Sequence, residues 1–332
     1  MNPTRQDINI PWVESPFFAS LLDAHCRTPE EKTAATRYHE DGYLILRGAV
    51  PDEVCDAVRS QVQPLFRPGV AEGSRSEYRV QDGYKESPAV RAVAGNARVL
   101  ETLRLLYGRR AFPFQTLNFL RGSQQRAHSD FIHFNSLPAR YMCGAWTALE
   151  DITLENGPLF YFKGSHKLPQ YTYFDLGLKD MKNDYVMYED HIERLAAQHA
   201  FPKENLLARK GDVLIWSSNL MHGGDKILKA GSTRWSQVTH YYFEDCLYFT
   251  PMYSDFLTGS LYHREIRDVT TGGFVNQTYN GKPFAALPVG GGRYLITNRM
   301  LMIGKAVSLA RRAGSSLKRA LFGGRMRADG YK

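Results

Sequence analysis

The chain has 332 residues, of which 43% are hydrophobic and 23% are charged. These fractions are typical of a globular protein with a sizeable core, and the chain contains no apolar run of about 18 residues that could cross a membrane. The first residues lack the basic-then-apolar layout of a secretory signal. Four widely separated cysteines favour reduced thiols and a cytoplasmic location. These are Cys26, Cys55, Cys143 and Cys246.

The net charge of +8 is concentrated near the end of the chain. Residues 293–332 contain ten Lys or Arg and one acid, Asp329, so this segment carries +9 and the preceding residues about −1. Apolar and basic residues alternate at helical spacing over about 297–322, which predicts a basic amphipathic helix. Such a helix suits peripheral contact with the inner face of a membrane, but a peripheral helix with a solvated basic face is the favoured interpretation. Nucleic-acid binding is not expected, because the segment matches none of the usual modules.

The first third of the chain is predicted to contain helices and one strand. Thr28 and Glu31 have the spacing of a helix capping box, and Pro29 occupies the first turn, so a helix is expected to run to about Glu40. Apolar periodicity and turn residues indicate the further elements. These are a strand at 43–47, a helix beginning at Pro51, and a helix over about 97–107. Residues 1–27 are expected to be an irregular but packed lead-in.

Short apolar runs separated by turn residues follow from Phe112 to Phe243, which is typical of strands. Helices followed by many short strands predict a mainly β fold with flanking helices. We expect a double-stranded β-helix, that is, a jelly-roll or cupin-like core of two sheets, supported by the amino-terminal helices. The mouth of such a core can hold a metal and small ligands.

The domain prediction assigns residues 1–250 to this core and residues 251–332 to an extension, aromatic at first and then basic. Residues 167–209 interrupt the strands, and a helix is expected near 188–199. This insertion is interpreted either as a substrate lid or as a surface excursion whose aromatic residues pack it down. The aromatic segment 248–262 is a candidate second wall of the pocket.

Two histidines and an aspartate have the order and spacing of metal ligands. If residues 128–130 are extended, His128 and Asp130 project from the same face of the chain and can bind one metal together. His222 lies 92 residues beyond Asp130 and follows a Gly-Asp turn and a β-rich run at 213–216. Two histidines and one carboxylate on one face of a metal, with the other positions open, form the facial triad of non-haem Fe(II) sites. We refer to His128, Asp130 and His222 as the triad.

The order of the motifs resembles the phytanoyl-CoA dioxygenase-like (PhyH) branch of the Fe(II)/2-oxoglutarate-dependent oxygenases. An H-x-D motif alone is common by chance, so the resemblance depends on its surroundings. Arg234 follows His222 by twelve residues, inside a strand-like run at 233–243. Three more segments match the family's order: Asp41–Gly48, Trp146–Asp151, and Glu155-Asn156-Gly157-Pro158-Leu159 with Gly164-Ser165-His166. The resemblance covers about residues 38–245.

The resemblance implies that the triad binds Fe(II) and that 2-oxoglutarate and O2 are cosubstrates. Arg234 would hold the distal carboxylate of 2-oxoglutarate, because a guanidinium offers planar two-point hydrogen bonding. Trp146 would border the cosubstrate. Gln115 and Asn118 are polar residues in an apolar run and are candidate donors to it, although they face opposite sides of a strand. Because related halogenases replace the carboxylate, the presence of Asp130 favours oxygenation.

Three functions remain open. The favoured one is a dioxygenase that hydroxylates an unactivated C–H of a small-molecule, natural-product or lipid- or carrier-linked substrate and releases succinate and CO2. Desaturation, cyclisation or epimerisation would use the same cofactors. The second is a zinc-type hydrolase in which the triad activates water, which gives Arg234 no role. The third is a non-catalytic jelly-roll binding protein that uses the basic tail. The aromatic insertion favours an apolar or ring-bearing substrate, and the tail favours an anionic partner.

Overall fold

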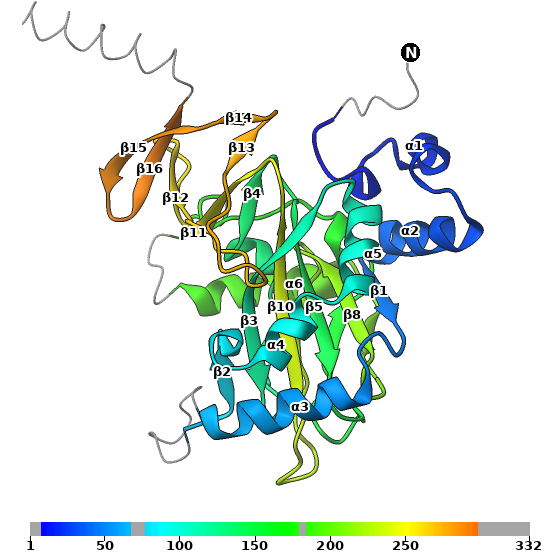
Figure 1. The fold of residues 1–332 in the computed structure, drawn as a ribbon. Helices are drawn as coiled ribbons and strands as arrows, with labels where there is room; N and C mark the ends of the chain where they lie inside the picture. Colours follow the sequence, from blue (N-terminus) through cyan, green and yellow to red (C-terminus); the bar gives the residue numbers. More distant parts are fainter. Residues whose placement is uncertain (1–7, 68–76, 179–183, 298–332) are drawn as a thin grey trace, which may run out of the picture.

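The computed structural model describes residues 8–67, 77–178 and 184–297 (Figure 1). Short helices precede most of the strands, and three of them, α3, α4 and α5, cross one face of the largest sheet (Figure 1). The α-helices are α1 Phe18–His25, α2 Pro29–Asp41, α3 Asp52–Val62, α4 Pro88–Ala94, α5 Ala97–Tyr107 and α6 Tyr185–Gln198. Among the described residues, none of the helices is both long and apolar enough to cross a membrane.

The largest sheet has six antiparallel strands in the order β1-β8-β5-β10-β3-β2. Its central strands are buried on both faces, because helices cover one face and a second sheet covers the other. The strands are β1 Tyr43–Leu46, β2 Arg79–Gln81, β3 Ala111–Phe119, β5 Met142–Ala148, β8 Val213–Ser217 and β10 Ser236–Phe243.

The second sheet has the order β7-β6-β9 and faces the inner side of the first. Its strands are β7 Lys203–Asn205, β6 Leu159–Phe162 and β9 His222–Gly224. A third antiparallel sheet, β15-β16-β12-β11-β4, gathers most of the later strands at one side (Figure 1). It comprises β4 Asn135–Leu137, β11 Leu247–Asp255, β12 Ser260–His263, β15 Ala285–Gly290 and β16 Arg293–Thr297, beside the hairpin of β13 Thr278–Tyr279 and β14 Lys282–Pro283.

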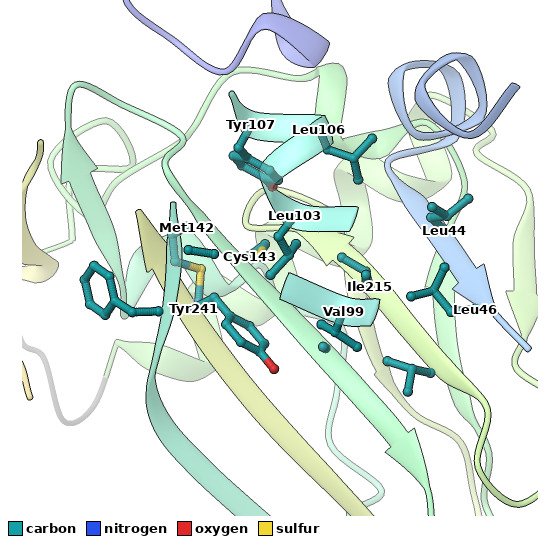
Figure 2. Packing of buried hydrophobic residues seen from close by; sticks show 14 of the residues in the cluster. Leu44, Leu46, Val99, Leu103, Leu106, Tyr107, Met142, Cys143, Ile215 and Tyr241 are labelled. Atoms are coloured by element: carbon teal, nitrogen blue, oxygen red, sulfur yellow. The ribbon is translucent and has the colours of Figure 1, made fainter. Parts of the chain in front are cut away.

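The main core lies between the helices and the largest sheet. Figure 2 shows Val99, Leu103 and Leu106 of α5 packed toward Cys143 of β5 and Ile215 of β8. Burial of each such aliphatic side chain contributes roughly 1.5–3 kcal/mol, so this interface anchors the sheet. All four cysteines are buried and none forms a disulfide.

Strand alternation divides the side chains of the largest sheet between two cores. On β5 and β8, Cys143 and Ile215 face the helices, whereas Trp146 and Trp216 face the second sheet. A period of two residues therefore sends one set of side chains into the helix-side core and the other into the space where the candidate site lies.

The predicted mainly β fold with supporting helices is confirmed. The capping box forms as expected, with Thr28 Oγ1 accepting from the Glu31 N–H at 3.2 Å and Glu31 Oε2 accepting from the Thr28 N–H at 3.2 Å. Two helices were not predicted: α1 lies in the segment expected to be irregular, and α4 is a short helix begun by the Ser87 side chain, which accepts from the Val90 N–H. The predicted basic helix at 297–322 lies almost wholly outside the described residues.

Gly144 is required by the close approach of Trp216, its partner across β5 and β8. A Cβ at Gly144 would overlap the indole ring of Trp216. We expect Gly144→Ala to lower the free energy of unfolding by about 1–3 kcal/mol, because overpacking a full core forces side chains out of their preferred positions. Denaturant unfolding measures this change. Gly273→Ala is the control, since its Cβ would meet only ordinary contacts, and an equal loss in both variants would contradict the explanation.

Candidate active site

A backbone bridge places the two triad histidines side by side. The N–H of His128 donates to the carbonyl of His222, and the N–H of His222 donates to the carbonyl of His128, both at 2.9 Å. The rings lie 4.5 Å apart between centroids. This antiparallel pair joins the segment after β3 to the start of β9, so the histidines approach each other although they are far apart in the sequence.

In each histidine, a hydrogen bond at the ring nitrogen Nδ1 fixes the orientation of the ring. Nδ1 of His128 contacts the carbonyl of Arg126 at 2.9 Å, and Nδ1 of His222 contacts the carbonyl of Leu220 at 3.0 Å. A carbonyl only accepts, so both Nδ1 atoms carry the proton and both Nε2 atoms keep a lone pair. The Gln125 side-chain amide nitrogen lies 3.4 Å from Nε2 of His128. Burial and the neighbouring His222 lower the pKa of His128 to about 3, which keeps its imidazole neutral at physiological pH.

Asp130 completes the group. Its Oδ1 lies 3.8 Å from Nε2 of His128, and its Oδ2 lies 3.9 Å from Nε2 of His222. One ligand atom from each triad residue lies within 4.8 Å of the others, a spacing that can hold one metal ion. Residues 128–130 were expected to be extended, but only part of the segment is: Ser129 is extended, and Asp130 begins a single 3-10 turn, Asp130–Ile132. Burial acts to raise the pKa of Asp130, but the neighbouring His222 and His240 lower it by more. The pKa therefore lies below its usual range, and the carboxyl is ionised.

Three residues around Asp130 differ from the prediction. Trp216 and His240 were not among the predicted site residues, and Gln115 was predicted to contact the cosubstrate. Trp216 Nε1 donates to Asp130 Oδ2 at 2.8 Å, and His240 Nε2 lies 3.6 Å from the same oxygen. The Gln115 side chain hydrogen-bonds Nδ1 of His240 at 3.0 Å. Gln115 therefore reaches the triad through His240. A histidine in the predicted strand-like run 233–243, six residues beyond Arg234, was the available signal for His240.

The triad and Arg234 line one cavity of about 80 Å³. Trp146, Trp216 and His240 also line it, together with Leu117, Phe119, Ser123, Gln125, Leu159, Gly223 and Val238. Arg234 was predicted to lie inside a strand, but it lies two residues before β10 begins. Its backbone N–H donates to the carbonyl of Leu120. The cavity is therefore bordered by a metal-ligand set on one side and a buried cation on the other.

Arg234 is suited to bind an anion. Its side chain is buried, and its guanidinium lies 5.8 Å from the Phe119 ring and 5.4 Å from the Trp146 ring. Among the residues that the structure describes, none provides an acceptor for its Nε. Burial lowers its pKa to about 10, so it remains a cation at neutral pH. Trp146 Nε1 also lacks an acceptor. A buried cation beside unpaired donors is costly unless a carboxylate or similar anion satisfies it, so these residues fit the distal end of 2-oxoglutarate.

Asn118 is not brought to this cavity. Its Nδ2 donates to Gln237 Oε1 at 3.2 Å on the opposite face of β3. Alternation along the strand puts Leu117 and Phe119 on the cavity side and Asn118 on the helix side. The predicted contact between Asn118 and the cosubstrate has no support in this arrangement.

The insertion packs directly against the segment that carries the triad. Arg126 pairs with Asp190 of α6 at 2.6 Å, and its Nε donates to Glu193 at 3.0 Å. The Tyr185 hydroxyl lies 3.1 Å from Nε2 of His133, three residues beyond Asp130. Helix α6, predicted at 188–199, therefore contacts the residues that flank the site. Its role as a lid stays a prediction.

Comparison with known families identifies the chain. The family model described as Phytanoyl-CoA dioxygenase (PhyH) matches residues 38–234, more than half of the chain. The peroxisomal phytanoyl-CoA dioxygenase of Homo sapiens is 24% identical over 276 residues, covering 74% of this chain and 78% of the human protein. The enzyme of Rattus norvegicus is 22% identical, covering 64% and 68%.

Solved structures share the fold. The epimerase SnoN from nogalamycin biosynthesis, in complex with Fe3+, alpha ketoglutarate and nogalamycin RO, has a TM-score of 0.54 at 20% identity, covering 80% of this chain and 98% of SnoN. EctD from S. alaskensis has a TM-score of 0.51 at 20% identity, covering 67% and 78%. The protein is a 2-oxoglutarate-dependent non-haem iron oxygenase. It belongs to the phytanoyl-CoA dioxygenase (PhyH) family.

The indole of Trp216 fixes one oxygen of Asp130, and its loss should weaken iron binding. We expect Trp216→Phe to reduce Fe(II) affinity about 10–100-fold, because partners that orient metal ligands typically contribute this much. Anaerobic titration with Fe(II) measures the change. Trp235→Phe is the control, since Trp235 is buried against Phe66 and Arg59, outside the cavity. Unchanged affinity in Trp216→Phe would show that Asp130 does not need this donor.

Proposed function

We propose that the protein hydroxylates an unactivated C–H of a small-molecule, natural-product or lipid- or carrier-linked substrate, with 2-oxoglutarate converted to succinate and CO2. The observation that carries this proposal is the single cavity shared by the triad and Arg234. The triad offers iron three ligands, and Arg234 lies where it can hold the far end of a cosubstrate that also reaches the iron. When bound, the iron would supply activation of O2.

The residues of the chain would then act by binding and orientation. Trp216 Nε1 donates to Asp130 Oδ2 and orients the carboxylate, which would hold the metal together with His128 and His222. A set of three protein ligands would leave open the positions that a two-point cosubstrate and O2 require. Trp146 and Phe119 flank the Arg234 guanidinium and exclude water around it, which strengthens its attraction for a carboxylate.

A different oxidative outcome is the second candidate. Epimerisation, ring closure or desaturation needs the same metal, cosubstrate and residues, and the fold is shared with the epimerase SnoN and the carbocyclase SnoK from nogalamycin biosynthesis. A zinc-type hydrolase is less suitable, because it would leave the buried Arg234 without a partner. Product analysis after turnover distinguishes these outcomes, since hydroxylation adds an oxygen atom to the substrate, whereas desaturation and ring closure remove two hydrogens.

The finer statements on domains, partners and location are also proposals. We propose a catalytic unit over residues 1–250, followed by an extension from residue 251, and a cytoplasmic location. Three strands of that extension, β12, β15 and β16, join the sheet that contains β4, and β4 directly follows the triad segment. This connection supports a role for the extension in shaping the substrate side of the site. Peripheral membrane contact would depend on the basic tail.

Iron and cosubstrate binding provide the first test. Addition of Fe(II) and then 2-oxoglutarate to the anaerobic protein is expected to produce a visible charge-transfer band, because the cosubstrate chelates the metal. Asp130→Ala and His222→Ala should lose the band and substrate-linked succinate release while keeping the fold, which circular dichroism reports. His199→Ala, on the exposed end of the insertion, is the control and should keep the band. A band that persists in both triad variants would rule out this ligand set.

Arg234→Lys tests the cosubstrate site separately from the metal. Lysine keeps the charge but loses planar two-point hydrogen bonding, so the Kd for 2-oxoglutarate should rise about tenfold or more, consistent with a charge-assisted hydrogen bond of about 1.5–3 kcal/mol. Fe(II) affinity should stay within about twofold. The same titration gives both values, with the exposed Arg194→Lys as the matched control. Equal 2-oxoglutarate affinity in Arg234→Lys and the native protein would remove Arg234 from the site.

A further inference from the structure

A second arginine has the same unsatisfied character as Arg234. In the part of the chain that the structure describes, Arg234 and Arg264 are the two arginines whose buried Nε lacks an acceptor. Arg264 follows β12, and its backbone N–H donates to the carbonyl of Tyr248 at 2.9 Å. Its Nη1 donates to Thr250 Oγ1 at 3.2 Å, and none of the described carboxylates forms an ion pair with it.

The surroundings of Arg264 also resemble those of Arg234. The guanidinium lies 4.9 Å from the Phe134 ring and 5.9 Å from the Phe114 ring, as Arg234 lies over Phe119 and Trp146. Aromatic faces attract a cation but provide no acceptor for its N–H groups. The hydrogen-bonding capacity of Arg264 is therefore only partly used by the protein.

A second donor without a partner lies beside Arg264. The Tyr242 side chain is fully buried, its ring stacks on Phe114 at 4.1 Å, and its hydroxyl has no hydrogen-bond partner among the described residues. Tyr242 and Arg264 both pack against the Phe114 ring, which places the two side chains in the same part of the core. Burial raises the pKa of Tyr242, while the positive charge of Arg264 acts against this rise. The hydroxyl is therefore protonated and available as a donor. A cation and a neutral donor together favour an anionic ligand.

This pair lies on the other side of the triad from Arg234. Along β10, His240 and Tyr242 face the same side and are about 7 Å apart, whereas Arg234 precedes His240 by six residues. The Phe134 and Phe114 rings lie 5.0 Å and 6.0 Å from the His240 ring. Arg264 is thus separated from the triad by one layer of aromatic rings. The Arg264 side chain as a whole is only partly buried.

We propose that Arg264 and Tyr242 form an anion-binding site for the substrate, which takes a carboxylate or phosphate group. The proposal rests on the proposed function, because it assigns the substrate class of the same active site. Arg234 would hold the anionic end of the cosubstrate on one side of the iron, and Arg264 the anionic end of the substrate on the other. The apolar part of the substrate would then lie along Phe114 and Phe134 and bring a carbon near the triad.

Binding of simple amphiphiles tests this site. Protein loaded anaerobically with Fe(II) and saturating 2-oxoglutarate is titrated calorimetrically with octanoate, octyl phosphate and the neutral octanamide. At least one of the anions should bind about tenfold or more tightly than octanamide, and the preferred anion shows whether a carboxylate or a phosphate is recognised. Arg264→Gln should bring anion and amide within about twofold of each other, and Arg264→Lys should retain part of the preference.

Two further variants make the test specific. Arg267→Gln removes a nearby exposed arginine that lies over Phe274 and should behave as the native protein. Tyr242→Phe keeps the ring and removes the hydroxyl, so anion affinity should fall about 2- to 10-fold. The site is refuted if the native protein shows no preference for either anion, or if Arg264→Gln keeps the preference.

The charge-transfer band of the same samples separates this inference from the proposed function. A band in the native protein and in Arg264→Gln shows that the iron and 2-oxoglutarate sites are intact and folded, so a lost anion preference belongs to Arg264. Absence of the band in the native protein would overturn the proposed function, and the anion titrations would still decide the Arg264 site by themselves.

Discussion

The pair of backbone hydrogen bonds between His128 and His222 is the constraint on which the site depends. It joins two segments that are separated in the sequence by the five strands β4 to β8, and it fixes the distance between the two imidazoles before any metal is considered. Each ring is then turned by a hydrogen bond from its own Nδ1 to a nearby carbonyl, so that both lone pairs face Asp130. The placement of the two histidine ligands is thus determined by the folded backbone.

The largest sheet connects this site to the rest of the molecule. On β8 the helix-side residue Ile215 belongs to the main core, and its neighbour Trp216 reaches Asp130 on the other face. The position of Trp216 in turn requires glycine at position 144, because a Cβ there would overlap the indole ring. Packing of the amino-terminal helices on the sheet therefore supports the orientation of the carboxylate, although no helix of that layer contacts the cavity.

Much of this arrangement could be predicted from the sequence, because it follows from the preferences of neighbouring residues and from the order of the motifs. The capping box at Thr28, the strand signals and the spacing of the triad depend on neighbours in the chain, which a single sequence displays. The contacts of His240 and Arg264 could not be predicted in this way. Their environments depend on which residues of β3, β10 and β12 face each other across sheets, and this information exists only in the register. The opposite orientations of Gln115 and Asn118 were foreseen from strand alternation, but only the register showed that Gln115 is the one that faces the triad.

The buried cysteines have a consequence for an enzyme that handles O2. Burial raises the pKa of Cys55 to about 11 and of Cys246 to about 12, and it raises that of Cys143 as well, so these thiols stay protonated. Oxidants attack the thiolate of an accessible cysteine, and none of the four cysteines of this chain is accessible. If O2 were activated at the bound iron in the absence of substrate, no reactive thiol would lie within reach. The side chains that line the cavity, among them Trp146 and Trp216, would be the groups exposed to oxidation instead.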